Sequence, residues 1–186
     1  MKRKAVFIDK DGTLVHDIPY NVNPDYVRFD DGVIEGLKEL KGAGYLLIGV
    51  SNQSGIAHGY FSEEALAAVV EDIQERLRRS GAALDDFLYC PHHPNGKVPG
   101  YSAECTCRKP KPGMLLRAAE KLNIDLSHSW MIGDILNDVE AGNQAGCRTV
   151  LINNGNETEW LLAENRKPTA IAGDVGEAAK IIMQEK

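Results

Sequence analysis

Two aspartates, Asp9 and Asp11, follow a short apolar run near the start of the chain. The run, residues 6–8, is β-branched and aromatic, which predicts a buried strand of a parallel sheet. Ligands of such sheets bind just outside the carboxyl ends of the strands, so we expect both carboxylates in a ligand site. Side chains two residues apart in extended chain share one face, at a separation that suits a common divalent cation. The following Gly12 and Thr13 complete the motif Asp-x-Asp-Gly-Thr, which favours an active site over a solvated Asp-Gly turn.

Polar residues also end two later apolar runs. Ser51 follows residues 45–50 and begins the stretch Ser-Asn-Gln-Ser-Gly, whose hydroxyl and backbone N–H groups can donate to phosphoryl oxygens. Asp134 ends another run, and a carboxylate at the end of a neighbouring strand can meet Asp9 to complete a magnesium site. Because the net charge is -6, the overall field of the protein does not attract an anionic substrate. A local cluster of basic side chains must bind it, such as the one in segment 108–111.

The segment 90–107 has no usable periodicity and contains Cys90, Cys105 and Cys107. Irregular loops of this length usually have a function of their own or are cross-linked by a metal ion or a disulfide. Three thiolates and one imidazole, from His92 or His93, would form a closed tetrahedral zinc site that adds folding energy. A disulfide is the alternative, but a reducing cytosol disfavours it and a Cys-x-Cys pair has poor geometry for bridging. We interpret the lone Cys147 as a small core residue in a later strand.

The motifs and their order resemble those of the haloacid-dehalogenase-like (HAD) phosphohydrolases over most of the chain. The resemblance implies that Asp9 is a covalent nucleophile and that Asp11 is a general acid/base able to hydrolyse its own phospho-enzyme. Ser51 would hold the phosphoryl group, and Lys109 would neutralise it together with the nucleophile. The implied magnesium ligands are Asp9, the backbone carbonyl of Asp11, and Asp134, with Asp138 supporting them.

The resemblance also implies the remaining ligands and contacts. Zinc-bearing family members place the first His of a Cys-Pro-His-His run on the metal, which favours His92. Arg108 would grip a second anionic substrate group. The other implied substrate-binding residues are Asp17, Ile18, Pro19, Tyr20, Asn52, Gln53 and Ser54.

Among named families, the D-glycero-D-manno-heptose 1,7-bisphosphate 7-phosphatases match best, and their relatives include histidinol-phosphate phosphatases. This predicts a magnesium-dependent phosphatase that removes the 7-phosphate through an aspartyl-phosphate. Sugar-bisphosphatase relatives often have Lys where this chain has Ile135, which weakens the prediction of a second-phosphate contact. Histidinol phosphate or another small phosphate monoester is the alternative substrate. A non-catalytic zinc-bearing binding module is a more distant alternative.

Alternating strands and helices must position these residues. Apolar runs at 45–50, 87–89, 130–134, 149–152 and 170–172 predict strands, and helical spacing predicts helices at 32–42, 62–80, 114–121 and 175–183. This alternation predicts an α/β fold with a Rossmann-like, doubly wound parallel sheet. We expect one domain, residues 1–186, with a minimal cap and the zinc loop 90–107 inserted.

The bulk composition restricts the class of protein. The chain has 186 residues, of which 43% are hydrophobic and 26% charged, as in ordinary globular proteins. Because no basic face or run of useful length occurs, we expect no nucleic-acid partner. No apolar run reaches the length of a membrane span, and the charged residues 1–4 are not followed by the apolar region of a signal peptide. We therefore predict a cytoplasmic monomer that acts on a small phosphorylated sugar without a membrane partner.

Overall fold

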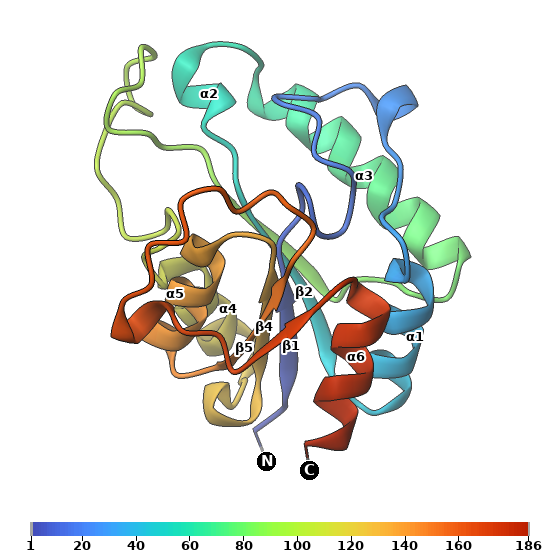
Figure 1. Ribbon diagram of the computed structural model, residues 1–186. Helices are drawn as coiled ribbons and strands as arrows, with labels where there is room; N and C mark the ends of the chain where they lie inside the picture. Colours follow the sequence, from blue (N-terminus) through green and yellow to red (C-terminus); the bar gives the residue numbers. More distant parts are fainter. Residues whose placement is uncertain (1, 186) are drawn as a thin grey trace.

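The computed structural model describes residues 2–185, and its centre is a parallel β-sheet (Figure 1). The strands of the sheet in this part of the chain lie in the order β3-β2-β1-β4-β5-β6. Their bounds are β1 Ala5–Ile8, β2 Leu46–Asn52, β3 Asp86–Cys90, β4 Trp130–Gly133, β5 Arg148–Ile152 and β6 Ala170–Ala172. Every neighbouring pair is parallel, so the predicted Rossmann-like sheet is confirmed.

Helices cover both faces of the sheet. In Figure 1, α1 and α6 lie on one side of the sheet, and α4 and α5 lie on the other. The α-helices are α1 Val33–Gly42, α2 Gly55–His58, α3 Glu63–Arg79, α4 Gly113–Leu122, α5 Leu136–Ala145 and α6 Val175–Gln184. Short 3₁₀ helices are η1 Pro24–Tyr26, η2 Leu126–His128 and η3 Glu164–Arg166.

The alternation of side chains along β1 divides the core into two clusters. Val6 and Ile8 belong to the cluster that also contains buried residues of α1, α3 and α6. Ala5 and Phe7 belong to the cluster that contains buried residues of α4. Because successive side chains of a strand point to opposite faces, a central strand that is buried on both faces has a continuous apolar sequence. The run that precedes Asp9 is apolar for this reason.

The strand β1 lies between β2 and β4, where the direction of the strand order reverses. Ligands of doubly wound sheets bind in the crevice at this point. Asp9 directly follows β1 and Asp134 directly follows β4, so both acids lie at the carboxyl edge of the sheet. The predicted arrangement of the two strand ends is therefore correct.

Local differences from the sequence predictions occur at the ends of elements. The strand β2 extends through Ser51 and Asn52 because both residues pair with β3, where Asn52 is opposite Cys90. The short helix α2, which follows, was not predicted. Cys147 is buried but precedes β5 instead of lying in it. Residues 91–112 form neither helix nor strand, as predicted for the zinc loop.

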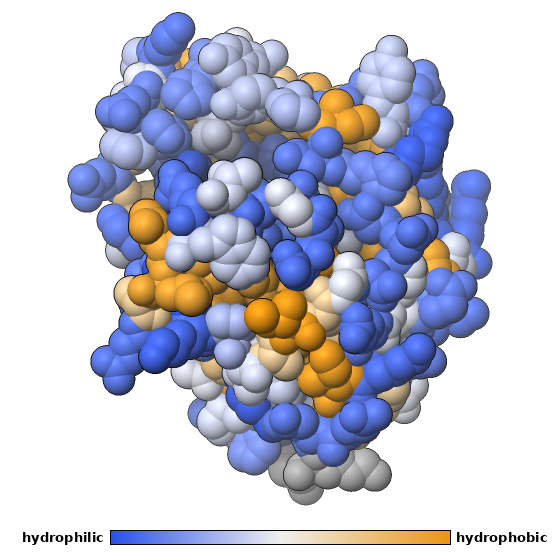
Figure 2. Space-filling model, in the orientation of Figure 1, coloured by the Kyte–Doolittle hydropathy of each residue, from blue (hydrophilic) through white to orange (hydrophobic). Residues whose placement is uncertain are grey.

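The surface in Figure 2 is mostly hydrophilic, with hydrophobic atoms concentrated in a band across the middle of the face shown. Large apolar side chains that are exposed include Trp160, Leu161, Leu162 and Ile171. None of the helices within residues 2–185 has the length and apolar character needed to cross a membrane.

Candidate active site

Three buried carboxylates gather at the carboxyl edge of the sheet. One ligand atom from each of Asp9, Asp134 and Asp138 lies within 4.8 Å of the others. Asp9 and Asp134 follow adjacent strands, and Asp138 is in the first turn of α5. Buried carboxylates that lie this close without a cation would repel one another, and oxygen ligands of this kind suit Mg²⁺. This donor set therefore fits a magnesium ion.

Lys109 reaches this cluster from the far end of the zinc loop. Its ammonium group forms an ion pair with Asp9, lies 2.7 Å from Asp138 Oδ1, and donates a 3.0 Å hydrogen bond to the Val50 carbonyl oxygen. The lysine side chain is almost completely buried. Since a buried ammonium group is stable only when it is paired, the carboxylates and Lys109 form one electrostatic unit.

The burial of this unit perturbs the ionisation of its members. Burial raises the pKa of Asp9 well above its ordinary value; Lys109 opposes the shift, and Asp138 and Asp134 add to it. Burial and the Asp138 carboxylate raise the pKa of Asp134 to about 7. Burial lowers the pKa of Lys109, but Asp138 and Asp9 raise it more, so its net shift is upward. The lysine therefore stays charged, and without a metal Asp9 and Asp134 bind protons readily.

Asn156 holds Asp134 in place, a contact that the sequence prediction missed. Its side-chain amide donates a 2.7 Å hydrogen bond to Asp134 Oδ2, and Asn154 donates a 2.7 Å hydrogen bond to the Gly12 carbonyl oxygen. Gly12 has a φ of +82°, and a Cβ there would lie 2.1 Å from Asp134 Oδ2. Glycine is therefore required because the backbone passes against the carboxylate. The sequence signal was the Asn-Asn-Gly-Asn stretch directly after β5, at the same edge of the sheet.

The Asp11 carboxylate is not in the acidic cluster, and the predicted magnesium ligand of this residue is its backbone carbonyl. One of its oxygens pairs with the buried Lys10 ammonium, and the other accepts a 2.9 Å hydrogen bond from Gln53 Nε2. The same nitrogen of Gln53 donates to Ser51 Oγ over 2.7 Å. Gln53 thus links the predicted acid/base to the predicted phosphoryl-binding serine. The burial of Lys10, which is only 3% exposed, was also not predicted.

A cavity of about 260 Å³ opens beside Asp11. Of the predicted substrate-binding residues, Ile18 and Arg108 do not line it. The lining residues are Lys10, Asp11, Asp17, Pro19, Tyr20, Asn21, Asn52, Gln53, Ser54 and Gly55. Burial and the Asp11 carboxylate raise the pKa of Asp17, while Lys10 opposes the shift. Most of the predicted substrate-binding residues therefore line one polar cavity beside the Asp11 carboxylate.

Asn52 connects this cavity to Lys109 through the backbone. Its side-chain amide donates a 3.0 Å hydrogen bond to the Lys109 carbonyl oxygen, and its side-chain oxygen accepts one of 3.0 Å from the Lys109 N–H. Arg108 Nη1 is 3.5 Å from the His92 carbonyl oxygen, and Lys111 is at the surface, 3.7 Å from Glu104. The two-point contact of Asn52 therefore fixes the segment from which Lys109 enters the site.

The zinc loop brings Cys90, His92, Cys105 and Cys107 together, with one ligand atom from each within 4.8 Å of the others. The three Sγ–Sγ distances are 3.0, 3.4 and 3.5 Å, and His92 Nδ1 lies 3.5 Å from Cys107 Sγ. Tetrahedral zinc with bonds of about 2.3 Å to sulfur separates thiolates by about 3.8 Å, so this donor set fits zinc. Burial raises the pKa of Cys90, and zinc binding must therefore release protons.

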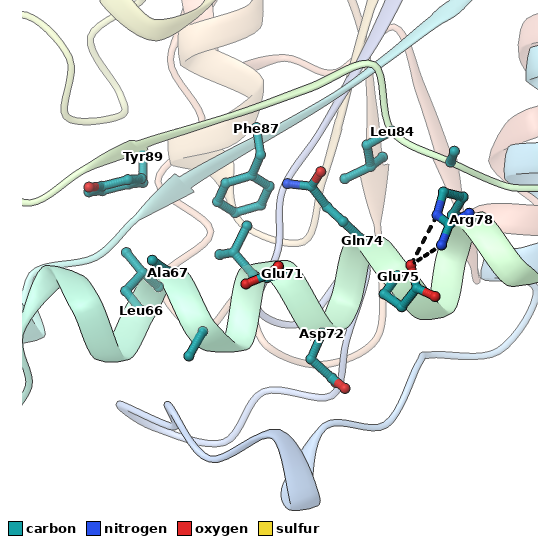
Figure 3. A pocket seen from close by; sticks show the side chains of 13 residues that line it. Leu66, Ala67, Glu71, Asp72, Gln74, Glu75, Arg78, Leu84, Phe87 and Tyr89 are labelled. Atoms are coloured by element: carbon teal, nitrogen blue, oxygen red, sulfur yellow. Dashed lines mark hydrogen bonds and ion pairs between the residues drawn. The ribbon is translucent and has the colours of Figure 1, made fainter.

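A larger hollow of about 760 Å³ lies between α3 and residues 83–89, which include part of β3. Figure 3 shows Phe87, Tyr89 and Leu84 facing this helix, with Arg78 turned toward Glu75. None of the acidic cluster, Lys109 or the zinc ligands lines this hollow. Because it has no convergent set of donors for an anion, we assign the chemistry to the smaller cavity.

Comparisons with known proteins agree with this geometry. A family model described as HAD-hydrolase-like matches residues 106–178. The D-glycero-β-D-manno-heptose-1,7-bisphosphate 7-phosphatase of Pasteurella multocida is 49% identical over 82% of this chain and 83% of that protein. The protein of the same name from Haemophilus ducreyi is 46% identical over 90% of this chain and 91% of that protein. A solved structure is also similar, that of D,D-heptose 1,7-bisphosphate phosphatase from B. bronchiseptica complexed with magnesium and phosphate. Its TM-score with this chain is 0.80 at 30% sequence identity, and the alignment covers 98% of this chain and 99% of that chain.

Proposed function

Since the chain belongs to the HAD-like hydrolases and, within them, to the D-glycero-β-D-manno-heptose-1,7-bisphosphate 7-phosphatases, we propose that it removes the 7-phosphate of that β-anomeric sugar bisphosphate. The resemblance inferred from the motifs is confirmed by these relatives. The chain is thus a phosphoric monoester hydrolase with magnesium and zinc as its metals. One observation carries the proposal: Asp9, Asp134, Asp138 and Lys109 converge at one edge of the sheet.

Asp9 is the proposed nucleophile. Its carboxylate attacks phosphorus in line and forms an aspartyl-phosphate, which divides one difficult displacement into two easier steps. Burial raises the pKa of Asp9, and the ion pair with Lys109 opposes that shift and so favours the ionised nucleophile. The lysine also offsets the charge on the phosphoryl oxygens, and positioning with charge neutralisation supplies most of the catalysis in phosphoryl transfer.

Asp11 is the proposed general acid/base. It protonates the departing sugar oxygen and later deprotonates the water that hydrolyses the aspartyl-phosphate. Lys10 and Gln53, which bind its two oxygens, hold it at the mouth of the cavity through which a leaving group and a water must pass. Ser51, bound to the same Gln53, donates its hydroxyl to a phosphoryl oxygen.

Asp9, Asp134 and the backbone carbonyl of Asp11 would hold magnesium, which would supply charge neutralisation for the phosphoryl group. Asp138 supports this set through Lys109. Cys90, His92, Cys105 and Cys107 would hold zinc, which would order the loop that continues into Arg108 and Lys109.

We propose that the polar cavity holds the sugar through Asp17, Pro19, Tyr20, Gln53 and Ser54. Ile18 and Arg108 do not line the cavity, and their predicted contacts with the substrate remain part of this proposal, with Arg108 binding a second phosphate. Asn52 contributes mainly by positioning Lys109.

One observation favours a second candidate. Ile135 replaces the lysine expected in sugar bisphosphatases and removes a cation next to Asp134. A substrate with a single phosphate, such as histidinol phosphate, needs no such cation. The decisive experiment measures kcat/KM for the β-heptose bisphosphate, histidinol phosphate and a panel of sugar monophosphates with magnesium present. Preference for the bisphosphate supports the main proposal, and preference for histidinol phosphate contradicts it.

We also propose that the protein acts as a single-domain monomer in the cytoplasm. All the proposed ligands of both metals come from one chain, so the site needs no second copy. The free thiols of the zinc cluster require a reducing compartment. Light scattering during size-exclusion chromatography tests the first point, because a dimer mass would contradict it.

A further inference from the structure

The loop after β5, residues 153–157, is bound at three places to the residues around the acidic cluster. Two of its side chains contact Asp134 and the backbone of Gly12, as described above. The third contact belongs to Glu157, whose Oε2 accepts a 2.7 Å hydrogen bond from the Leu136 N–H. No sequence pattern pointed to Glu157. It is the member of this loop that binds the first turn of α5.

Glu157 places a negative charge at the N-terminus of α5. Leu136 is the first residue of the helix and is completely buried, so its N–H needs a partner within the protein. The other oxygen of Glu157 accepts a 2.8 Å hydrogen bond from the Glu159 N–H. Burial raises the pKa of Glu157, but the backbone N–H groups that it binds lower it more, so the net shift is downward. The ionised carboxylate also interacts favourably with the helix dipole.

The segment that follows Glu157 is bound to the other end of the same helix. Asn143, in the last turn of α5, donates hydrogen bonds of 2.8 and 3.0 Å to the carbonyl oxygens of Asn165 and Lys167. The segment after β5 is therefore attached to both the first and the last turn of α5. This double attachment fixes Glu157 relative to the helix.

Asp138 lies in the first turn of α5, and its two oxygens bind in different directions. Oδ1 is 2.7 Å from Lys109 Nζ, and Oδ2 accepts a 3.3 Å hydrogen bond from the Ile135 N–H at the start of the helix. The carboxylate is also packed against β4, because a Cβ at Gly133 would lie 2.4 Å from Asp138 Oδ2. The contact between Asp138 and Lys109 therefore depends on the exact placement of this turn.

The N–H groups at the start of α5 compete with Lys109 for the Asp138 carboxylate. Free N–H groups of a helix N-terminus bind acceptors within reach, and the side chain of a first-turn acid is such an acceptor. While Glu157 binds the Leu136 N–H, Asp138 keeps one oxygen on Lys109. Without that acceptor, the buried N–H would draw the Asp138 carboxylate toward the helix end. Lys109 would then bind Asp9 alone.

We propose that Glu157 is a positioning residue of the phosphatase site, and that its carboxylate, by binding the N-terminus of α5, keeps Asp138 on Lys109 and so sets the charge around the magnesium ligands. This inference deepens the proposed function and rests on it, because it concerns the residues that hold the cation and the nucleophile. Glu157 does not line the substrate cavity, so its effect on the reaction passes through Asp138.

The test measures magnesium binding to the zinc-loaded enzyme by isothermal titration calorimetry, without substrate. Glu157→Met keeps the length of the side chain but has no strong acceptor, and the Kd for magnesium should rise by about 10-fold or more, as expected for loss of a group that orients metal ligands. Glu157→Gln retains an acceptor oxygen for the Leu136 N–H and should stay within about threefold of wild type. Glu159→Met is the matched control, because Glu159 is exposed and two residues away, and its magnesium affinity should be unchanged.

Kinetics at saturating magnesium separate positioning from a general loss of stability. For Glu157→Met, kcat should fall by about 10-fold and KM should stay within about twofold, because Lys109 is repositioned on the nucleophile while the substrate cavity is intact. The losses should be alike on the β-heptose bisphosphate and on p-nitrophenyl phosphate. Urea unfolding in EDTA measures the stability of the same proteins, and Glu157→Ala is the second variant if Glu157→Met does not fold.

The outcomes are distinct. Lower stability with unchanged magnesium affinity and kcat would show that Glu157 is only a helix cap and would overturn the inference. An equal loss of magnesium affinity in Glu157→Gln and Glu157→Met would also overturn it. Wild-type enzyme that hydrolyses p-nitrophenyl phosphate but not the bisphosphate would instead contradict the proposed substrate, so the two failures are distinguishable.

Discussion

Replacing Lys109 with methionine tests whether the acidic cluster depends on its one buried cation. Methionine has a similar length but no charge, so the substitution removes the ammonium group with little change in volume. The three carboxylates of Asp9, Asp134 and Asp138 then remain buried within 4.8 Å of one another. Within residues 2–185, no other basic side chain forms an ion pair with these three carboxylates in the metal-free protein.

The expected loss of stability follows from this geometry. Two unit charges 4.8 Å apart repel by about 3 kcal/mol at an effective dielectric constant of about 20. Removing one partner of a buried ion pair destabilises proteins by about 3–5 kcal/mol. We therefore expect the free energy of unfolding in EDTA at pH 8 to fall by about 3 kcal/mol or more. The loss should be smaller at pH 6, because the carboxylates can then bind protons.

The sign of the pH effect follows from the raised carboxyl pKa values. The pKa of Asp134 is raised to about 7, whereas that of an unfolded aspartate is about 3.9. Between these values the folded state binds more protons than the unfolded state, so the stability of the metal-free protein falls as pH rises. Stability that Asp134 contributes in its protonated form is fully present below about pH 4 and is lost as pH passes 7.

Urea unfolding, with and without magnesium, measures these differences. Magnesium should stabilise the Lys109→Met protein more than the wild type, because the cluster has one more uncompensated charge. Lys111→Met is the control, since Lys111 is half-exposed and should change stability by less than about 0.5 kcal/mol. Equal stability of the two variants in EDTA, or a loss at Lys109 that magnesium does not reduce, would refute this electrostatic account.

Three further predictions concern the proposed site. Asp9→Asn should reduce phosphate release to background with the fold intact by circular dichroism, and substantial turnover would refute the nucleophile assignment. Asn156→Ala should weaken magnesium binding by about 10-fold or more, seen as a higher magnesium concentration for half-maximal activity, because Asp134 loses the donor that orients it; unchanged magnesium dependence would contradict this. Cys105→Ser should lose zinc by mass spectrometry and lower the melting temperature, whereas Cys147→Ser should keep its zinc; equal zinc content in both would exclude Cys105 as a ligand.

The sequence by itself determined the parts of this protein that depend on local pattern. The apolar run before Asp9 identified a central strand, because only a strand buried on both faces is apolar without alternation. The acids at the ends of two such strands then had to meet, since parallel strands share one carboxyl edge. The cysteines in an irregular loop similarly indicated a zinc site, and the family resemblance favoured His92 over His93 as the fourth ligand. These four side chains come together.

Only the tertiary structure decided which side chains support these residues. Gln53, which was predicted as a substrate contact, lines the cavity and also bridges Asp11 and Ser51. Asn52 holds the backbone of Lys109. Asn156 reaches Asp134 from a loop that has no regular pattern. The direction of such side chains depends on how distant segments meet, and no local periodicity encodes that. The contact of His58 with His93 likewise exists only because backbone hydrogen bonds hold α2 against the zinc loop.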